Sequence, residues 1–167
     1  MQKSSRPRGK WRDVVFGSIG LLVVIADQLS KAWIRVNLAR GQSLFDIGFF
    51  QIVNVHNTGA AFGILKDHTL ALTIVAFVGI IVILLLLFVL QSRWSFLDSL
   101  LVRSAIGLII GGTIGNLIDR LHLGYVTDFI DFKVWPAFNI ADSAVTVGVI
   151  IIAYGIIFLV KPAKHQE

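Results

Sequence analysis

Residues 69–90 read TLALTIVAFVGIIVILLLLFVL and contain no charged side chain. A helix of this length, at about 1.5 Å per residue, crosses the hydrocarbon core of a bilayer. Three other stretches of the chain are comparably long and apolar. The mean hydropathy of +0.81 also excludes an ordinary soluble globule. We therefore predict an integral membrane protein, mainly α, with four transmembrane helices at residues 14–34, 69–90, 97–117 and 142–160.

Tryptophans and basic residues indicate how these helices cross the membrane. The tryptophans near the span ends are Trp11, Trp33, Trp94 and Trp135, as is typical of residues at a lipid–water interface. Residues 1–12 form a basic tail, and Lys161 and Lys164 follow the last span. The positive-inside rule then predicts that both termini are cytoplasmic. For the basic tail we expect contact with anionic lipid and no nucleic acid.

The first span resembles a secretory signal peptide, because basic residues precede an uncharged run. Asp27 and Gln28 follow that run without a small-x-small cleavage site. We therefore predict that the span is retained. The whole chain, residues 1–167, is expected to form one transmembrane domain.

Two segments lie outside the predicted spans, at residues 36–68 and 120–139. Within the first, Leu44–His56 is rich in Phe, Ile and Val, which predicts a small extended or β segment at the outer membrane interface. Unpaired backbone is not tolerated in lipid, so both segments should lie at the interface.

Polar residues gather near the outer ends of the spans. Asp27 and Lys31 are one helical turn apart, which favours an ion pair that anchors the helix with Lys31 reaching outward. Asn57 either forms a turn with Gly59 or presents its amide to a substrate carbonyl. In the third span, Gly107, Gly111 and Gly115 recur every four residues and permit close approach of a neighbouring helix.

Further along, Asn116, Asp119 and Arg120 lie on roughly one helical face. The two charged residues either wet the helix end or belong to a site, whereas Asn116 needs a partner at lipid depth. Taken singly, Asp142 is typical of a helix N-cap, and Asp128 is typical of a surface carboxylate. If the two meet in a desolvated cleft, they share a proton and act as general acid and base.

Metal and cofactor chemistry have little support in the sequence. The chain has no cysteine, and its only glutamate is the terminal Glu167. His56, His68 and His122 lack the i, i+4 spacing of a helical metal site. We therefore expect neither a metal nor another cofactor.

Five ordered motifs resemble those of bacterial lipoprotein signal peptidase (signal peptidase II), over about residues 13–160. They are DQLSK at 27–31, NTGAAF at 57–62, GGTIGNLIDR at 111–120, VTDFID at 126–131 and FNIAD at 138–142. The stretch between Asp128 and Asp142 is shorter than is common in the family. The shape of the rim near Trp135 is therefore expected to differ, whereas the motif positions of the two acids are unaffected.

The resemblance implies an aspartyl endopeptidase of the bacterial inner membrane, with its active site near the outer face. Such an enzyme removes the signal peptide of prolipoproteins just before a diacylglyceryl-modified cysteine. By motif position, Asp128 and Asp142 would be the catalytic pair. The supporting or substrate-binding residues would be Asp27, Lys31, Asn57, Gly59, Asn116, Asp119, Arg120, Asp131, Asn139 and Ala141.

We expect the substrate to arrive laterally, with its signal helix against the glycine-lined span, while residues 44–62 close over it. Its partners would be lipidated precursors and membrane lipids, and the enzyme would be a monomer. One alternative is a proton-coupled transporter or channel that uses intramembrane Asp and Asn. Against it, the centres of the second and fourth spans contain no ionisable residue. A second alternative is a structural membrane protein without activity.

Overall fold

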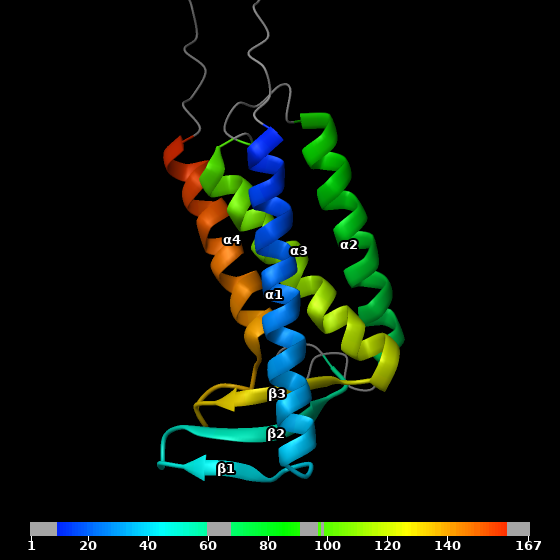
Figure 1. Ribbon diagram of the computed structural model, residues 1–167, viewed down its shortest axis with the longest axis vertical. Helices are drawn as coiled ribbons and strands as arrows, with labels where there is room; N and C mark the ends of the chain where they lie inside the picture. Colours follow the sequence, from blue (N-terminus) through cyan, green and yellow to red (C-terminus); the bar gives the residue numbers. More distant parts are fainter. Residues whose placement is uncertain (1–9, 60–67, 91–96, 98, 160–167) are drawn as a thin grey trace, which may run out of the picture.

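Four long helices and a small sheet form the fold of the computed structural model (Figure 1). The structure describes residues 10–59, 68–90, 97 and 99–159. The helices are α1 (Lys10–Asn37), α2 (Thr69–Leu90), α3 (Leu100–Leu123) and α4 (Ile140–Leu159). Each of the 4 is long and apolar enough to cross a membrane, which confirms the predicted class of fold. Trp94 lies outside the described residues.

The bounds of α3 differ most from the predicted span. Its N-cap is Ser99, whose side chain accepts a hydrogen bond from the Val102 backbone N–H. The helix continues beyond Leu117 to Leu123 and ends at Gly124, whose φ of 77° is left-handed. Hydropathy marks where the apolar run stops, whereas the helix ends where the backbone meets a residue suited to that conformation. Asn116 therefore lies well inside the helix.

The sheet contains β1 (Ser43–Asp46), β2 (Gln51–Asn57) and β3 (Val126–Asp131), antiparallel in the order β1-β2-β3. The first two strands confirm the extended segment predicted between Leu44 and His56. The third was not predicted, because only pairing with β2 reveals it. The sheet lies at the end of the bundle opposite to the start of α1 and the end of α4 (Figure 1).

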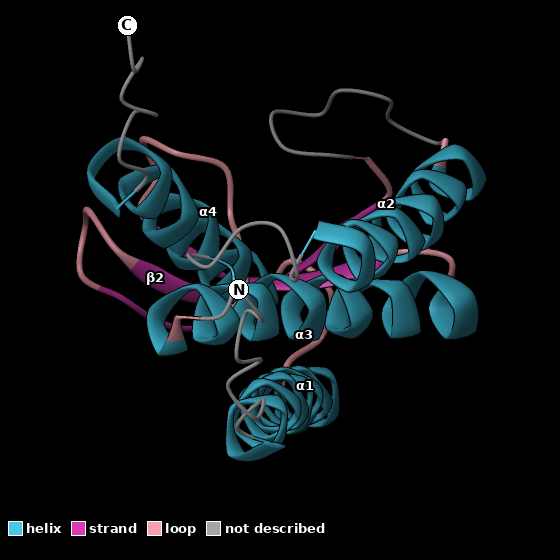
Figure 2. Ribbon diagram, turned by 90° about the horizontal axis from the view of Figure 1, so that it is seen from above, coloured by secondary structure: helices cyan, strands magenta, loops and turns pink. Residues whose placement is uncertain are grey.

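Helix α3 is the centre of the bundle, with α1 on one side and both α2 and α4 on the other (Figure 2). Glycines allow this close packing. A Cβ added at Gly111 would lie 2.6 Å from the Gly20 carbonyl oxygen of α1, and one added at Gly112 would collide with the Ala141 carbonyl oxygen of α4. The predicted close approach of helices is therefore confirmed.

The neighbours of the glycines also correct one expectation. Gly107 and Gly111 are covered by α1, and a Cβ on Gly115 would lie 2.5 Å from the Asp27 carboxylate of the same helix. This glycine face is filled by the protein itself. The expectation that a substrate's signal helix lies against it is therefore wrong.

An apolar cluster fixes the sheet beneath the bundle. Ile34 and Leu38 at the end of α1 pack with Phe129 of β3. The register between β2 and β3 shifts between Ile52 and Val55, and Val55 then pairs with Asp128. Since residues of a strand alternate between faces, Asn57 shares a face with Val55 and Asp128. That face carries the candidate site.

Candidate active site

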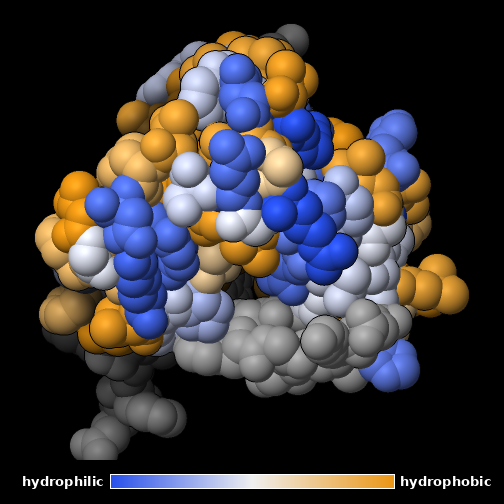
Figure 3. Space-filling model, turned by 90° about the horizontal axis from the view of Figure 1, so that it is seen from below, coloured by the Kyte–Doolittle hydropathy of each residue, from blue (hydrophilic) through white to orange (hydrophobic). Residues whose placement is uncertain are grey.

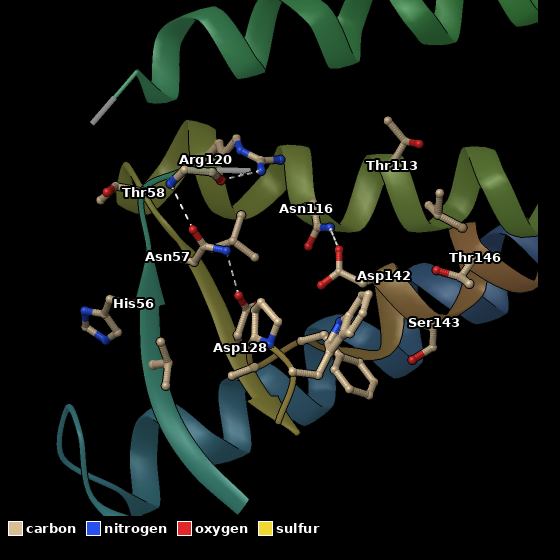
Figure 4. A pocket seen from close by; sticks show the side chains of 18 of the residues that line it. His56, Asn57, Thr58, Thr113, Asn116, Arg120, Asp128, Asp142, Ser143 and Thr146 are labelled. Carbon is tan, nitrogen blue, oxygen red and sulfur yellow. Dashed lines mark hydrogen bonds between the residues drawn. The ribbon is translucent and has the colours of Figure 1, made fainter. Parts of the chain in front are cut away.

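A cavity of about 960 Å³ opens between this sheet face, α3 and the start of α4 (Figure 4). Six of the residues expected at a site line it: Asn57, Gly59, Asn116, Arg120, Asp128 and Asp142. Its apolar wall includes Val145 and Val147 of α4, and Trp135 and Phe138 border it. The cavity therefore joins an acidic centre to surfaces from membrane-spanning helices.

Asp128 enters the cavity from β3 and is 1% exposed. The Asn57 amide Nδ2 donates to its Oδ2 at 2.9 Å, and the Asn139 amide Nδ2 donates to its Oδ1 at 2.7 Å. Both carboxyl oxygens are thus held by amides from different elements. The alternative of a solvated surface carboxylate at Asp128 is wrong.

Asp142 enters the same cavity from the first turn of α4. The Asn139 side-chain oxygen accepts from the Asp142 backbone N–H at 2.9 Å, and Asp142 Oδ2 accepts from the Asn139 backbone N–H at 3.2 Å. This reciprocal pair is a capping box, in which Asn139 is the N-cap. The alternative that Asp142 itself caps the helix is therefore wrong. Its Oδ1 accepts from Asn116 Nδ2 at 2.7 Å.

Asn139 consequently holds both acids. Its side chain donates to Asp128, and its backbone N–H donates to Asp142. Asn139 is fully buried. Two carboxyl groups from separate elements are thereby directed at one cavity, as Figure 4 shows.

Burial raises the pKa of Asp128 to about 7, and the neighbouring charge of Asp142 adds to this effect. The hydrogen bonds from Asn57 and Asn139 act in the opposite direction. Near neutral pH the Asp128 carboxyl group therefore holds a proton for much of the time. A carboxyl group with such a pKa can act as a general acid at neutral pH.

This raised pKa predicts a pH-dependent stability. The pKa of Asp128 is 3.8 when unperturbed and about 7 in the fold, so between these values the folded state binds more protons than the unfolded state. Stability is then fully present below about pH 4 and falls as the pH rises towards 7, by about 4 kcal/mol for the full interval. Melting in detergent from about pH 5 to pH 8 should show this decline, and Asp128→Asn should flatten it. If the melting temperature depends on pH in the same way for the parent and for Asp128→Asn, the raised pKa of Asp128 is contradicted.

Beneath the cavity lies a buried charged cluster, which we define as Asp27, Lys31 and Asp119. Lys31 Nζ is 2.8 Å from Asp27 Oδ2 and 3.5 Å from Asp119 Oδ2. The side chain of Lys31 is 0% exposed, because the ammonium points into the bundle. The predicted ion pair is confirmed, but the expectation that Lys31 reaches outward is wrong. Asp119 is 1% exposed, so it does not wet the helix end.

Two motif segments contribute through their backbone. Asn57 Oδ1 accepts from the Gly59 N–H at 2.9 Å, so Asn57 forms the predicted turn while its amide group holds Asp128. Arg120 Nη2 donates to the Gly59 carbonyl at 3.5 Å and lines the cavity. The Ala141 N–H donates to Asp27 Oδ1 at 3.0 Å, which ties α4 to α1.

Comparison with known proteins agrees with this arrangement. A family profile described as signal peptidase (SPase) II matches residues 19–158. The chain belongs to the signal peptidase II family. The lipoprotein signal peptidase of Dehalococcoides mccartyi strain CBDB1 is 47% identical over 154 residues, covering 92% of this chain and 93% of that protein. That of Moorella thermoacetica is 44% identical over 149 residues, covering 89% and 94%.

A solved structure agrees at the level of the fold. The chain is similar to a bacterial membrane enzyme determined by the in meso method at 2.3 Å resolution, with a TM-score of 0.77 and 34% identity. The match covers 89% of this chain and 91% of that one. The protein is thus a membrane signal peptidase II, an aspartic-type protease, and its bacterial family fits an inner-membrane protein with prolipoprotein substrates.

Among the residues expected at the site of this signal peptidase, Asp131 alone neither lines the cavity nor bonds to the residues that support its two acids. Its Oδ2 accepts from Gln51 Nε2 at 2.6 Å and its Oδ1 from the Lys133 N–H at 2.7 Å, so it fixes the end of β3. Successive residues of a strand point to alternate faces of the sheet. Asp131 is three positions after Asp128, so the two side chains lie on opposite faces.

Sequence reasoning missed several residues of this signal peptidase site. Arg35 bonds to Asp119 and Thr127, and Gln28 bonds to Asp27 and Asp119. Arg35 was detectable, because it lies one helical turn beyond Lys31 on the same face. His56 borders the cavity and stacks on Tyr125 with ring centroids 3.8 Å apart. No spacing signal identifies that contact.

Proposed function

We propose that Asp128 and Asp142 are the catalytic pair, and that they hydrolyse the peptide bond preceding a diacylglyceryl-modified cysteine in a prolipoprotein. The observation that carries this proposal is the shared support of both acids by Asn139 at one cavity. Asn57 and Asn116 each hold one acid from the other side. Such preorganised amide donors keep reacting groups aligned without rearrangement during the reaction.

In the proposed mechanism the pair begins with one proton. The Asp142 carboxylate takes a proton from a water molecule as the water oxygen attacks the scissile carbonyl carbon. The Asp128 carboxyl group, with its pKa of about 7, donates its proton to the carbonyl oxygen, which produces a tetrahedral diol. Asp142 then protonates the leaving nitrogen while Asp128 recovers a proton from the diol, so the C–N bond breaks and the pair is restored.

The walls of the cavity support a substrate that stays in the bilayer. Thr113 of α3 and Val145, Thr146 and Val147 of α4 line one side, and all belong to membrane-spanning helices. Acyl chains can remain in lipid beside these surfaces while the scissile bond reaches the acids. We therefore propose that the substrate enters the cavity laterally from the bilayer, along a surface other than the glycine face of α3.

We further propose that the sheet lies at the outer face and that both termini are cytoplasmic. The basic residues near the chain ends support this orientation. Figure 3 views the sheet end, where hydrophilic and hydrophobic side chains lie side by side. Among the residues of β1 and the turn that follows it, Phe45 and Phe49 are exposed. Such a mixture suits the lipid–water interface.

The transporter alternative is less well supported. A proton path needs ionisable groups at successive depths. Within the described parts of α2 and α4, the single acidic or basic side chain is Asp142, in the first turn of α4. The acids instead converge at one end of the bundle. An inactive structural protein is opposed by the membership of the family.

The lipid on the substrate should matter strongly. A precursor without diacylglycerol is expected to show a kcat/KM at least about 30-fold lower than the lipidated form. Burial of each CH2 is worth about 0.8 kcal/mol, so even a few methylenes placed against the enzyme would produce this difference. The measurement is the rate of signal-peptide release from both forms in the same detergent.

A matched control is a precursor of identical sequence tested after enzymatic lipidation in the same preparation, so that detergent and sequence effects cancel. Equal kcat/KM for the two forms would remove lipid recognition from the proposal. It would leave the assignment of Asp128 and Asp142 unaffected.

A further inference from the structure

Lys31 touches more than its ion-pair partners. Its Nζ donates to Asn116 Oδ1 at 2.8 Å, the same distance as to Asp27 Oδ2. An ammonium has three hydrogens to donate and no lone pair to accept. Asp27, Asp119 and Asn116 therefore all present oxygens to Lys31, and the fully buried side chain has no contact with water.

The charges of this region are balanced within the protein. Asp119 Oδ1 is 3.4 Å from Arg35 Nη1, so two carboxylates face two cations. Asp27 Oδ1 also accepts from the Ala141 backbone N–H, and Asp119 Oδ2 also accepts from the Thr127 backbone N–H. A buried charge is tolerated only when it is paired and hydrogen-bonded in this way. The cluster therefore joins α1, α3, β3 and α4 as one rigid support.

Asn116 connects the cluster to the catalytic centre. Its Oδ1 accepts from Lys31 and from Asn139 Nδ2 at 3.1 Å, and its Nδ2 donates to Asp142 Oδ1 at 2.7 Å. If the amide rotated by half a turn, its NH2 would face the ammonium and its oxygen would face the Asp142 carboxylate. These two contacts and the one from Asn139 would then become repulsive. Lys31 is the charged donor of the two that hold Oδ1, so it contributes most to fixing the orientation of the amide.

We propose that Lys31 is a positioning residue of this peptidase: its buried ammonium locks the Asn116 amide in the orientation that donates a hydrogen bond to Asp142. The proposal rests on the proposed function, because it takes Asp142 as a catalytic acid. Lys31 itself does not line the cavity. It acts through Asn116.

The test must remove the ammonium without leaving an unpaired buried charge. The double variant Asp27→Asn/Lys31→Met removes one charge of each sign, and Asp119 keeps Arg35 as its partner. With the lock gone, kcat on a lipidated precursor should fall at least about 30-fold while KM changes less than about threefold, because the substrate's own contacts remain.

A double-mutant cycle with Asn116→Ala separates positioning from general support. If Lys31 acts through Asn116, adding Asn116→Ala to the neutral double variant should lower kcat less than about threefold further. In the parent enzyme the same substitution should cost at least about 30-fold. Losses that multiply, or a kcat of the neutral variant within about threefold of the parent, would overturn the proposal.

The chain offers a matched control at the other end of the same two helices. Arg103 Nη1 of α3 is 2.9 Å from Asp13 Oδ1 of α1. Arg103 lies in the first turn of α3, more than three turns before Asn116. Asp13→Asn/Arg103→Met is expected to change kcat less than about twofold. If Asp27→Asn/Lys31→Met does not melt cooperatively, Asp27→Asn/Lys31→Gln replaces it, since a glutamine amide cannot impose one orientation on Asn116.

Failure of this inference is distinguishable from failure of the proposed function. Asp142→Asn is assayed alongside. If Asp142→Asn is inactive while the neutral Lys31 variant retains its kcat, only the positioning role is overturned. If Asp142→Asn itself remains active, the assignment of the catalytic pair is overturned and the positioning role with it.

Discussion

Asp128→Asn is expected to lower the rate of precursor cleavage by at least about 10³-fold, and Asp142→Asn by a similar factor. An amide can neither take a proton from water nor donate one to the carbonyl oxygen, and acid–base catalysis commonly contributes about 10²–10⁴-fold. Each proposed step uses both acids, so either substitution interrupts the reaction. The measurement is release of the signal peptide from a lipidated precursor in detergent.

Asp46→Asn is the matched control for this pair of variants. Asp46 is an acid at the same end of the molecule, but it is exposed and paired with Lys133 Nζ at 2.5 Å. Lys133 also lowers the pKa of Asp46, so its carboxyl group stays ionised and holds no proton to donate at neutral pH. This variant should retain the parent rate within about twofold.

Both inactive variants should still fold, since they replace one planar side chain by another of the same shape. Cooperative melting in detergent checks this point. Cleavage at more than about a tenth of the parent rate by Asp128→Asn or by Asp142→Asn would contradict the proposed mechanism.

Gly112→Val is expected to destabilise the fold by at least about 3 kcal/mol, which corresponds to roughly 10 °C in the melting temperature. Even a Cβ at this position would collide with the Ala141 carbonyl oxygen and lie 2.9 Å from Val145 Cγ2. Backbone cannot move aside as a flexible side chain can. Helix α4 must therefore shift away from α3, and Asp142 moves with it.

Gly79→Val is the control. Gly79 lies in α2, and a Cβ there has nothing within 4 Å. This variant should melt within about 2 °C of the parent and cleave at the parent rate. Equal melting temperatures for Gly112→Val and Gly79→Val would mean that the contact between α3 and α4 is looser than the structure has it.

Much of the fold was predictable because lipid imposes simple rules. A long uncharged run such as residues 69–90 has few alternatives to a membrane helix, and α2 has those bounds. The end of α3 was less predictable. Polar residues such as Asn116 and Asp119 remain helical because they find partners inside the bundle, and hydropathy does not contain that information.

The candidate site was predictable as a set of residues and not as an arrangement. The ordered motifs selected Asp128 and Asp142. They also selected Asp131, three positions after Asp128 in the same motif, but this residue bonds to Gln51 and belongs to the end of β3. The third strand arises only by pairing with β2, and that pairing decides which of these acids faces the cavity. Long-range pairing leaves no local periodicity to read.

By itself, the sequence determined that this chain crosses the membrane, which residues are its candidates for chemistry, and which family it resembles. Composition and local order are sufficient for these conclusions, because transfer to lipid is decided residue by residue. Only the tertiary structure decided that Asn139 holds both acids, that the glycines are covered by α1 and α4, and that Lys31 points inward to Asn116. These facts depend on hydrogen bonds and contacts between residues far apart in the chain, whose geometry exists only once the helices have packed.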